Sequence, residues 1–458
     1  MDKINNIFIP YLIFLSTIFN LILNQMGISY LYAIITMVGI VLLLLKGVKI
    51  YLIDCIFLSI IVLVIVSSFA HSLIDQEFIR SVKGLAIYIL FPIYWFLVFR
   101  QKKEFDFRSL LKKTIPWVYL IALLGIIQFF ISPDLYGLIG EGYSKNIQWA
   151  LESDTSSFNA FFRATSIFGS PQIFGLFLAL YFIVMTEFYG LKNNKIILSA
   201  HVNIAGDRNC IAENNVTVTN AKRGRTKQAV FKFILTVFRN NAIRILYLVY
   251  IVAALLSGNK SVILILLIFL VYKFITTYSV NKLIMAAKIL FFSVVLMFFL
   301  LAITNKGSIG AIDRLYNIDR IVSDEKNDRL QIYNQHFLRG NIIFGSGSGS
   351  MMSLDGENDN ELPASESYLL QILLEFGLFY FILFVVSMIL ILACSRKTNI
   401  KILKVLLVSI FTSMLIVHAF NNPVFFIFWG VIMYAYSTIL ISKDTHMMIK
   451  GNRTLGHS

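Results

Sequence analysis

The sequence predicts an all-α integral membrane protein with about twelve transmembrane helices, and three observations lead to this prediction. Hydrophobic residues make up 58% of the 458 residues and charged residues only 14%, whereas soluble domains are closer to half apolar and a quarter charged. The apolar residues form runs that approach the ~20 residues needed to cross a bilayer. These runs lack the alternating polar residues of barrel strands. They are therefore expected to be helices, which satisfy their own backbone hydrogen bonds in lipid.

The predicted spans follow one another along the whole chain, which we expect to form one polytopic membrane domain over residues 1–458. The first run is expected to stay in the chain rather than be cleaved as a signal sequence, because it lacks a small-residue cleavage site and a second span follows almost at once. The twelve runs cover residues 7–24, 28–45, 50–70, 85–99, 114–132, 170–189, 242–257, 261–276, 285–304, 368–394, 405–420 and 423–441.

Basic residues predict the orientation of these spans. When the long loops 190–244 and 305–367 are left out, 19 Lys and Arg residues fall on one side of the membrane and 5 on the other. The basic side is expected to be cytosolic, which places both termini and residues 190–241 inside. Residues 133–163 and 305–367 then form large outer loops. The net charge of +15 is therefore expected to reflect the excess of basic residues in the cytosolic loops. We expect no folded domain that could use this charge to bind a nucleic acid.

The three cysteines predict neither a disulfide framework nor a metal site. Cys55 and Cys394 lie in predicted spans and Cys210 lies in the predicted cytosolic loop, so no outer loop contains a cysteine. No metal-ligand spacing is present, and we expect no metal or other cofactor.

The outer loop 305–367 is too long to serve only as a connection, because loops of more than about 15 residues are usually functional or disordered. A glycine run lies within it, at Gly345, Gly347 and Gly349. Two interpretations remain open for this run. It is either a flexible hinge or a backbone nest whose N–H groups hold an anion.

Three cations are candidates for an outer phosphate site. Ser170-Pro171 predicts a helix N-terminus, with serine as the cap and proline at the first helical position. Arg163 would lie beside this positive end of the helix, an arrangement suited to phosphate. Lys260 occupies a tight outer turn, and Arg329 projects from the large loop. Each of the three also fits a plainer interpretation, as an interfacial anchor or a solvated surface charge.

The start of the span 368–394 contains polar residues at helical spacing. Ser367, Gln371 and Glu375 recur every four residues and share one helix face. A carboxylate within a membrane is costly, so Glu375 is expected to be either functional or a link between helices. Glu366 falls in the first turn, where it would also complement the helix dipole. Asp54, near the cytosolic end of another span, is expected either to snorkel toward the interface or to be paired.

Three stretches of the sequence occur in a fixed order along residues 163–380. The first is Arg163-Ala-Thr-Ser-Ile-Phe-Gly-Ser-Pro-Gln-Ile-Phe-Gly175, the second is Ser257-Gly-Asn-Lys260-Ser, and the third runs from Arg329 through the glycine run to Ser365-Glu-Ser-Tyr-Leu-Leu-Gln-Ile-Leu-Leu-Glu-Phe-Gly377. In this order the chain resembles the bacterial O-antigen polymerases (the Wzy type) and the related O-antigen ligases. The ligases typically carry a histidine just before the span that begins here at Tyr368. This chain has Glu366 in that region, and this difference favours the polymerases.

The resemblance implies a GT-C-like polytopic glycosyltransferase in the bacterial cytoplasmic (inner) membrane. Such a polymerase joins undecaprenyl-pyrophosphate-linked repeat units into O-antigen or capsular polysaccharide. Its implied partners are the lipid-linked glycans, membrane lipid, a chain-length regulator and a flippase, with no nucleic acid. The implied catalytic residues are Arg163, Arg329 and Glu366, with Glu366 as the general base. The implied substrate-binding residues are Lys260, Gly345, Gly347, Gly349 and Glu375.

Two alternatives remain open at this point. A ligase would transfer the finished chain to the lipid A-core, and a flippase or other transporter would move the lipid-linked units without joining them. A transporter seldom needs a charged outer loop as long as 305–367, and its charges tend to line a path at the membrane midplane.

Overall fold

A computed structural model describes residues 2–101, 105–130, 166–188, 245–277, 342–345, 367–394, 401–416 and 420–437, together with 288 and 291. Residues 29, 49, 52, 53, 76, 77, 169, 171, 187, 258 and 421 are exceptions within those ranges. Every regular element in these ranges is helical and none is a strand, which confirms the all-α prediction.

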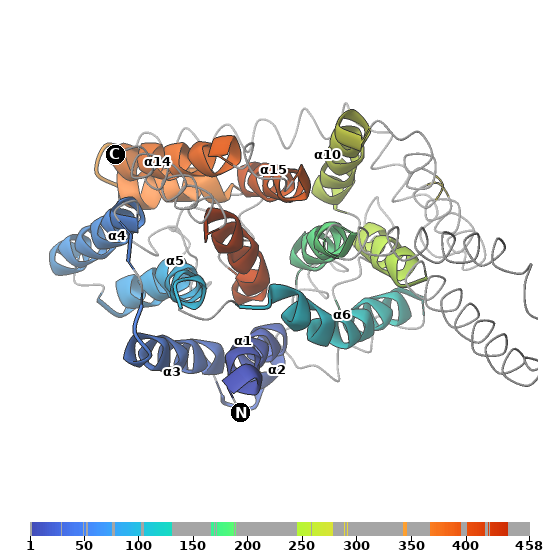
Figure 1. Cartoon of the computed structure of the whole chain (residues 1–458), viewed down its shortest axis with the longest axis horizontal. Helices are drawn as coiled ribbons and strands as arrows, with labels where there is room; N and C mark the ends of the chain where they lie inside the picture. The colour runs from blue at the N-terminus through green and yellow to red at the C-terminus, as the bar shows by residue number, and fades with distance from the viewer. Residues whose placement is uncertain are drawn as a thin grey trace, which may run out of the picture.

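The helices coincide with the predicted spans, except for 285–304, which lies outside the described residues apart from two positions. Apolar helical stretches without a label in Figure 1 cover Gln172–Thr186, Ile245–Leu256 and Pro423–Ser437. The labelled elements are α1 (Asp2–Ile18), α2 (Asn20–Gln25), α3 (Leu31–Leu45), α4 (Asp54–Asp75), α5 (Phe78–Phe99), α6 (Phe107–Phe130), α10 (Lys260–Thr277), α14 (Tyr368–Cys394), α15 (Lys401–Ile416) and the 3-10 turn η3 (Pro423–Phe425).

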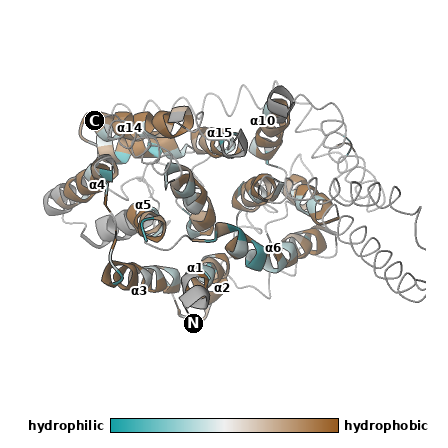
Figure 2. Ribbon diagram, in the orientation of Figure 1, coloured by the Kyte–Doolittle hydropathy of each residue, from teal (hydrophilic) through white to brown (hydrophobic). Residues whose placement is uncertain are grey.

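Two helices are long and apolar enough to cross a membrane by length and composition, at Phe107–Phe129 and Tyr368–Ala393. The other apolar helices are shorter. Large apolar side chains also remain exposed on the outer helices. Figure 2 colours most residues of these helices brown, the hydrophobic end of its scale. Exposing such area to water costs about 25 cal/mol per Å², so these faces suit lipid. On α3 the exposed residues repeat at helical spacing: Ile34, Met37, Val38, Val41, Leu42 and Leu45.

The stretch Pro423–Ser437, named here the central helix, lies in the middle of the bundle and is drawn in dark red in Figure 1. It packs against α5, where the indole Nε1 of Trp95 donates a hydrogen bond of 2.9 Å to the Phe426 carbonyl oxygen. Gly430 permits this approach, because a Cβ there would lie 2.7 Å from the Trp95 ring. Close packing around one buried indole therefore fixes the distance between α5 and the central helix.

A buried ion pair joins α4, α5 and the central helix. Asp54 is 0% exposed and Arg100 is 4% exposed. The Arg100 guanidinium donates from Nε to Asp54 Oδ2 at 2.8 Å and from Nη2 to Oδ1 at 2.6 Å. The Tyr436 hydroxyl donates to Oδ1 at 3.1 Å, and the Tyr51 backbone N–H donates to Oδ2 at 2.9 Å. Of the two alternatives expected for Asp54, the structure shows pairing.

Aromatic rings complete the surroundings of Arg100. Its guanidinium carbon lies 5.3 Å from the centroids of both the Tyr51 and the Tyr436 rings. Such rings stabilise a desolvated cation through their electron-rich faces. The pair is thus satisfied on every side, which is the condition under which a buried ion pair is tolerated.

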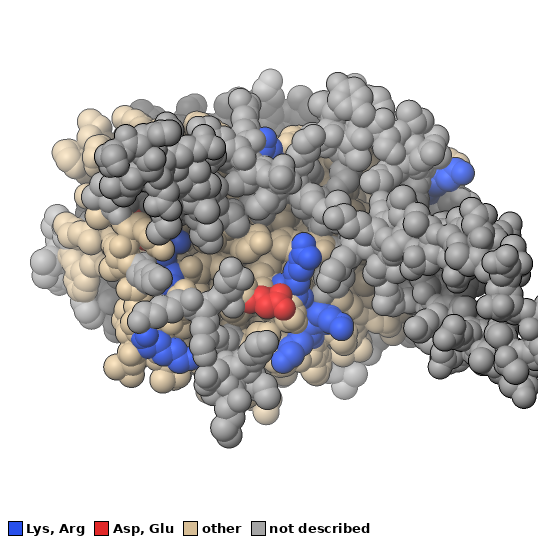
Figure 3. Space-filling view, in the orientation of Figure 1, with Lys and Arg blue, Asp and Glu red and all other residues tan. Residues whose placement is uncertain are grey.

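Lys and Arg side chains of the described residues gather around an acidic group on the face shown in Figure 3.

On α6, Asp106 precedes the first helical residue and accepts a hydrogen bond from the Ser109 backbone N–H at 3.2 Å, as a helix cap does. A further hydrogen bond from the Ser109 hydroxyl is the main reason that the pKa of Asp106 is lowered.

We expect Asp54→Ala to destabilise the protein by about 3–5 kcal/mol, because it leaves the Arg100 charge buried without a partner. The double variant Asp54→Ala/Arg100→Leu is expected to lose less, since no buried charge remains. Thermal unfolding of the purified protein in detergent measures both. A double variant as unstable as the single one would show that the ion pair itself, rather than the orphaned charge, sets the cost.

Candidate functional site

Helix α14 is not the single straight span expected over 368–394. Gly377 interrupts it with φ 83° and ψ 174°, outside the helical region. The rings of Tyr368 and Phe384 lie 6.5 Å apart between centroids, although sixteen residues of straight helix would separate them by about 24 Å. The chain therefore folds back at Gly377, and Figure 1 draws α14 as two neighbouring orange segments.

A turn at residues 342–345, within the long predicted loop 305–367, packs into this fold-back. The Leu378 backbone N–H donates a hydrogen bond of 2.8 Å to the Ile342 carbonyl oxygen. Gly345 has φ +79°, and a Cβ at this position would overlap the Glu375 carbonyl oxygen. A Cβ at Gly377 would likewise overlap the Ile343 carbonyl oxygen. Only glycine fits either position, so Gly345 belongs to a fixed backbone contact rather than to a flexible hinge.

Glu375, whose backbone carbonyl forms part of this contact, is 0% exposed. The Gln371 side-chain amide donates to Glu375 Oε1 at 2.9 Å, which confirms that the two residues share one face of the helix. Across from them on α5, the Tyr88 hydroxyl is buried without a hydrogen bond of ordinary geometry, although the Glu375 carboxylate acts on it electrostatically. A carboxyl group, an amide and a phenol are thus gathered inside an apolar bundle.

Aromatic rings surround these polar groups. The Tyr88 ring lies 5.9 Å from the Tyr368 ring and 4.9 Å from the Phe376 ring, between centroids. The Trp429 ring lies 6.4 Å from Tyr368, and its Nε1–H is also buried without a hydrogen bond. We call Tyr88, Tyr368, Gln371, Glu375 and Trp429 the Glu375 cluster. Its dense packing places the start of α14 inside the protein rather than at the surface.

The first two stretches of the resemblance also meet in space. Gly175 packs so closely against Ser257 that a Cβ on the glycine would overlap the serine hydroxyl oxygen. Nearby, the Asn259 side-chain amide donates a 3.4 Å hydrogen bond to the Gln172 carbonyl oxygen. The helix at 172–186 and α10 therefore begin side by side.

Both of these helix starts are capped. Ser170 Oγ accepts a 3.5 Å hydrogen bond from the Ile173 N–H, and its carbonyl oxygen accepts one of 3.0 Å from the Phe174 N–H. The prediction that a helix begins at Ser170 is confirmed. At α10, Asn259 Oδ1 accepts the Ser261 N–H at 3.0 Å. Two neighbouring N-termini direct their partial positive charge toward the same end of the bundle.

The backbone at Ser166 is held onto α6 by Gln128. Ser166 adopts a left-handed conformation with φ 50°. Gln128 Oε1 accepts the Ser166 N–H at 2.7 Å, and Gln128 Nε2 donates to the Ser166 carbonyl oxygen at 3.4 Å. The Ser166 hydroxyl donates to the Ile121 carbonyl oxygen at 2.8 Å. These bonds fix the backbone three residues after Arg163.

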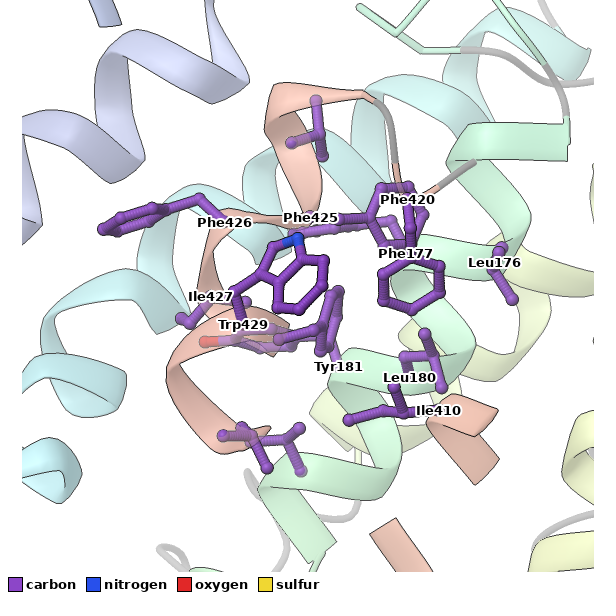
Figure 4. Close-up of a cluster of buried hydrophobic side chains, with 14 of the residues drawn as sticks. Leu176, Phe177, Leu180, Tyr181, Ile410, Phe420, Phe425, Phe426, Ile427 and Trp429 are labelled. Atoms are coloured by element: carbon purple, nitrogen blue, oxygen red, sulfur yellow. The ribbon is translucent and has the colours of Figure 1, made fainter. Parts of the chain in front are cut away.

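A row of aromatic rings connects the two halves of the site. Between centroids, Tyr368 lies 5.9 Å from Phe420, Phe420 lies 4.8 Å from Phe425, and Phe425 lies 6.5 Å from Phe177. Figure 4 shows Phe177, Phe420 and Phe425 meeting beside Trp429. Because these rings are fully buried, the fold-back of α14 and the paired helix starts are set at a fixed separation.

Of the predicted site residues, the structure brings Gly345 and Glu375 together. Lys260 is the first residue of α10, and only its backbone is described. Sequence reasoning did not single out Gln128, Asn259 or Tyr88. A glutamine within the apolar run 114–132 was the available signal for the first of these. The remaining predicted residues lie outside the described ranges: Arg163, Arg329, Glu366, Gly347 and Gly349.

Within the described ranges, no group of three or more His, Cys, Asp or Glu side chains is placed to hold a metal ion. No protein-family profile, no curated protein and no solved structure matches the chain. The functional interpretation therefore rests on the residues themselves.

We expect Gly345→Ala to destabilise the protein much more than Gly27→Ala. Both glycines have positive φ, at +79° and +77°, but a Cβ at Gly27 meets nothing within 4 Å. Gly27→Ala therefore carries only the left-handed cost of about 1–2 kcal/mol, whereas Gly345→Ala must also displace the backbone at Glu375. Thermal unfolding in detergent compares the two. Equal losses would mean that the turn at 342–345 is not held against α14.

Proposed function

We propose that this chain is a multi-pass membrane glycosyltransferase that joins undecaprenyl-pyrophosphate-linked repeat units into O-antigen or capsular polysaccharide. One observation carries the proposal. Gly345 and Glu375 are thirty residues apart in the stretch that resembles the polymerases, and their backbones are in contact. Glycine-only packing against the backbone of α14 at Glu375 is a constraint that a simple outer connection does not need. The paired starts of the first two stretches, at Gln172 and Asn259, support it.

The proposed topology has twelve spans, with both termini in the cytosol and the loops 133–163 and 305–367 outside. The contacts between helix ends agree with this alternation for the spans that they join, whereas the fold-back at Gly377 means that 368–394 does not cross the membrane as one straight helix. Asp54, Arg100 and Tyr436, which bond to one another, all belong to cytosolic ends in this topology. Asn259 and Gln172, which bond to one another, both belong to outer ends. The basic face in Figure 3 fits the cytosolic side.

In the proposed reaction, a hydroxyl of an incoming repeat unit attacks the anomeric carbon of a chain held on undecaprenyl pyrophosphate. A new glycosidic C–O bond forms as the bond to the pyrophosphate breaks, and the pyrophosphate leaves with the electron pair. Negative charge therefore develops on the leaving group, and fixed cations lower the barrier. We assign this role to Arg163, Arg329 and Lys260, at an end of the bundle where two helix N-termini already favour an anion.

The proton of the attacking hydroxyl is assigned to Glu366, immediately before the described start of α14. Glu375 has a different role in this proposal. Its carboxyl group is fully buried and accepts a hydrogen bond from the Gln371 amide, so it is assigned to linking two turns of α14, while its backbone packs against Gly345. Gly347 and Gly349, which follow this turn in the sequence, are assigned to binding the substrate pyrophosphate.

The test is an assay in liposomes with the purified full chain and purified lipid-linked repeat units as the only glycan. Formation of a ladder of longer lipid-linked chains supports the proposal. Movement of the units across the membrane without elongation would identify a transporter. Transfer only after a lipid A-core acceptor is added would identify a ligase.

In that assay we expect Arg329→Ala to leave mainly single-unit product, with normal insertion of the protein. Losing one preorganised donor typically lowers a rate by about 100- to 1,000-fold. Arg329→Lys is expected to retain part of the activity, because it keeps the charge but loses the two-pronged hydrogen bonding. Asp328→Ala is the neighbouring control and should behave as wild type. A full ladder from Arg329→Ala would remove this residue from the site.

The orientation predicts that position 355 faces the outside. A cysteine replacing Asp355, in a background without the three native cysteines, should react with a membrane-impermeant reagent in intact cells. Reaction only after permeabilisation would reverse the topology and contradict the whole site.

A further inference from the structure

One face of α6 changes from basic to apolar along its length. Lys113, Trp117, Leu120, Leu124 and Ile127 recur every three or four residues and therefore share one helix face. Lys113 is exposed at the start of this face and Trp117 is half-buried. The three aliphatic residues that follow are 44%, 38% and 40% exposed. We call these five residues the α6 face, which has a charged end and an apolar length.

The charged end of the α6 face is built against α1. The Lys113 Nζ lies 5.9 Å from the centroid of the Tyr11 ring, so the cation is attracted to the face of that ring. The Tyr11 hydroxyl accepts a hydrogen bond of 2.7 Å from the Trp117 indole Nε1. The Trp117 ring also lies 5.6 Å from the Phe19 ring, between centroids. Contacts with α1 thus restrict where Lys113 and Trp117 can lie.

The positive charge at this end is not balanced within the described part of the chain. Lys112 is exposed beside Lys113, and no carboxylate of the described residues forms an ion pair with either lysine. Asp106 has other partners. The hydrogen bond from the Ser109 hydroxyl is the main cause of its lowered pKa, and the charge of Arg108 adds to this effect. Two lysine charges therefore remain for an anionic partner.

We propose that the α6 face binds one anionic phospholipid, with its phosphate at Lys112 and Lys113 and an acyl chain along the apolar length. Charge complementarity favours this occupant, because a neutral lipid or an apolar helix would leave both lysines without a counter-ion. The length also fits. Residues 117–127 extend about 15 Å at the helical rise, and one leaflet contributes half of the ~30 Å hydrocarbon core. In the proposed topology this is the cytosolic leaflet. The inference does not depend on the proposed reaction.

The lysines, rather than the apolar residues, determine which lipid is preferred. On the apolar length one acyl chain replaces another, and this exchange releases no surface from water. An anionic headgroup gains an attraction to the two lysines that a zwitterionic headgroup with the same chains lacks. Each lysine near an anionic membrane surface strengthens binding about fivefold. Two lysines together therefore correspond to a preference of about 25-fold.

Helix α3 provides a matched control. Its exposed apolar face is followed by a single exposed lysine, Lys46, which belongs to a cytosolic end in the same topology. No tryptophan occurs within α3. Lys46→Gln therefore removes a comparable interfacial charge without changing the α6 face.

The inference is tested by native mass spectrometry of the purified full chain in detergent, with phosphatidylglycerol and phosphatidylcholine that carry identical acyl chains. The wild-type protein should bind phosphatidylglycerol more tightly. Lys112→Gln/Lys113→Gln should weaken binding of the first phosphatidylglycerol about 25-fold and leave phosphatidylcholine unchanged, whereas Lys46→Gln should change neither. Both lysines are exposed, so the double variant should fold normally.

Three outcomes of this experiment would overturn the inference. The first is a wild-type protein without a preference for phosphatidylglycerol. The second is an equal loss in the Lys46→Gln variant, which would indicate a general attraction of basic residues to anionic lipid. The third is displacement of the lipid by an equal concentration of glycerol phosphate, which would indicate a site for free anions.

A second measurement locates the lipid. Brominated acyl chains quench the fluorescence of a nearby indole, and the contribution of Trp117 is the difference between the wild-type protein and Trp117→Phe. In nanodiscs, a small fraction of brominated phosphatidylglycerol should quench this contribution more than the same fraction of brominated phosphatidylcholine. Lys112→Gln/Lys113→Gln should abolish the difference. Equal quenching by the two lipids in the wild-type protein would contradict the inference, and neither measurement requires polymer formation.

Discussion

The glycine backbones at 345 and 377 approach too closely for any side chain to stand between them, and the candidate site is arranged around this contact. It allows α14 to fold back, and the fold-back carries Tyr368 inward to meet rings from α5 and the central helix. The same approach brings a segment of the long loop against Glu375. A membrane helix rarely gives up its straight hydrogen-bonded course without compensation. Here the Leu378–Ile342 hydrogen bond supplies part of it.

Two other sets of contacts, an ion pair and a row of packed rings, keep this arrangement rigid. At one end of the bundle, the Asp54–Arg100 pair fixes the ends of α4, α5 and the central helix through charge and ring contacts. In the middle, the rings from Tyr368 to Phe177 form a continuous packed row. Lipid provides no hydrophobic force between helices, so shape-matched rings and satisfied polar groups are what determine helix positions in such a protein.

The sequence predicted those features that depend on local chemistry. Helix positions followed from apolar runs, the start at Ser170 followed from its capping chemistry, and the shared face of Gln371 and Glu375 followed from helical spacing. For Asp54, its position near the end of a span left snorkelling and pairing open, and the structure shows pairing. The fold-back at Gly377 did not follow, because a glycine in an apolar run is equally compatible with a straight helix. Gln128 and Ser166 lie 38 residues apart in the sequence and are joined by hydrogen bonds. The spacing of residues along a chain does not predict such a long-range contact. The roles of Arg163, Arg329 and Glu366 remain predictions.

The fold-back of α14 also affects the order in which the protein can be assembled. Its first half, residues 368–376, extends only about 13 Å at the helical rise, far less than the ~30 Å hydrocarbon core. This segment cannot enter the bilayer as an independent span. It needs partners for its buried polar groups, and two of its ring contacts, Phe420 and Trp429, are synthesised after it. The Glu375 cluster is therefore complete only after nearly the whole chain has left the ribosome. In a nascent chain that stops before Phe420, these two rings are missing from the surroundings of Glu375.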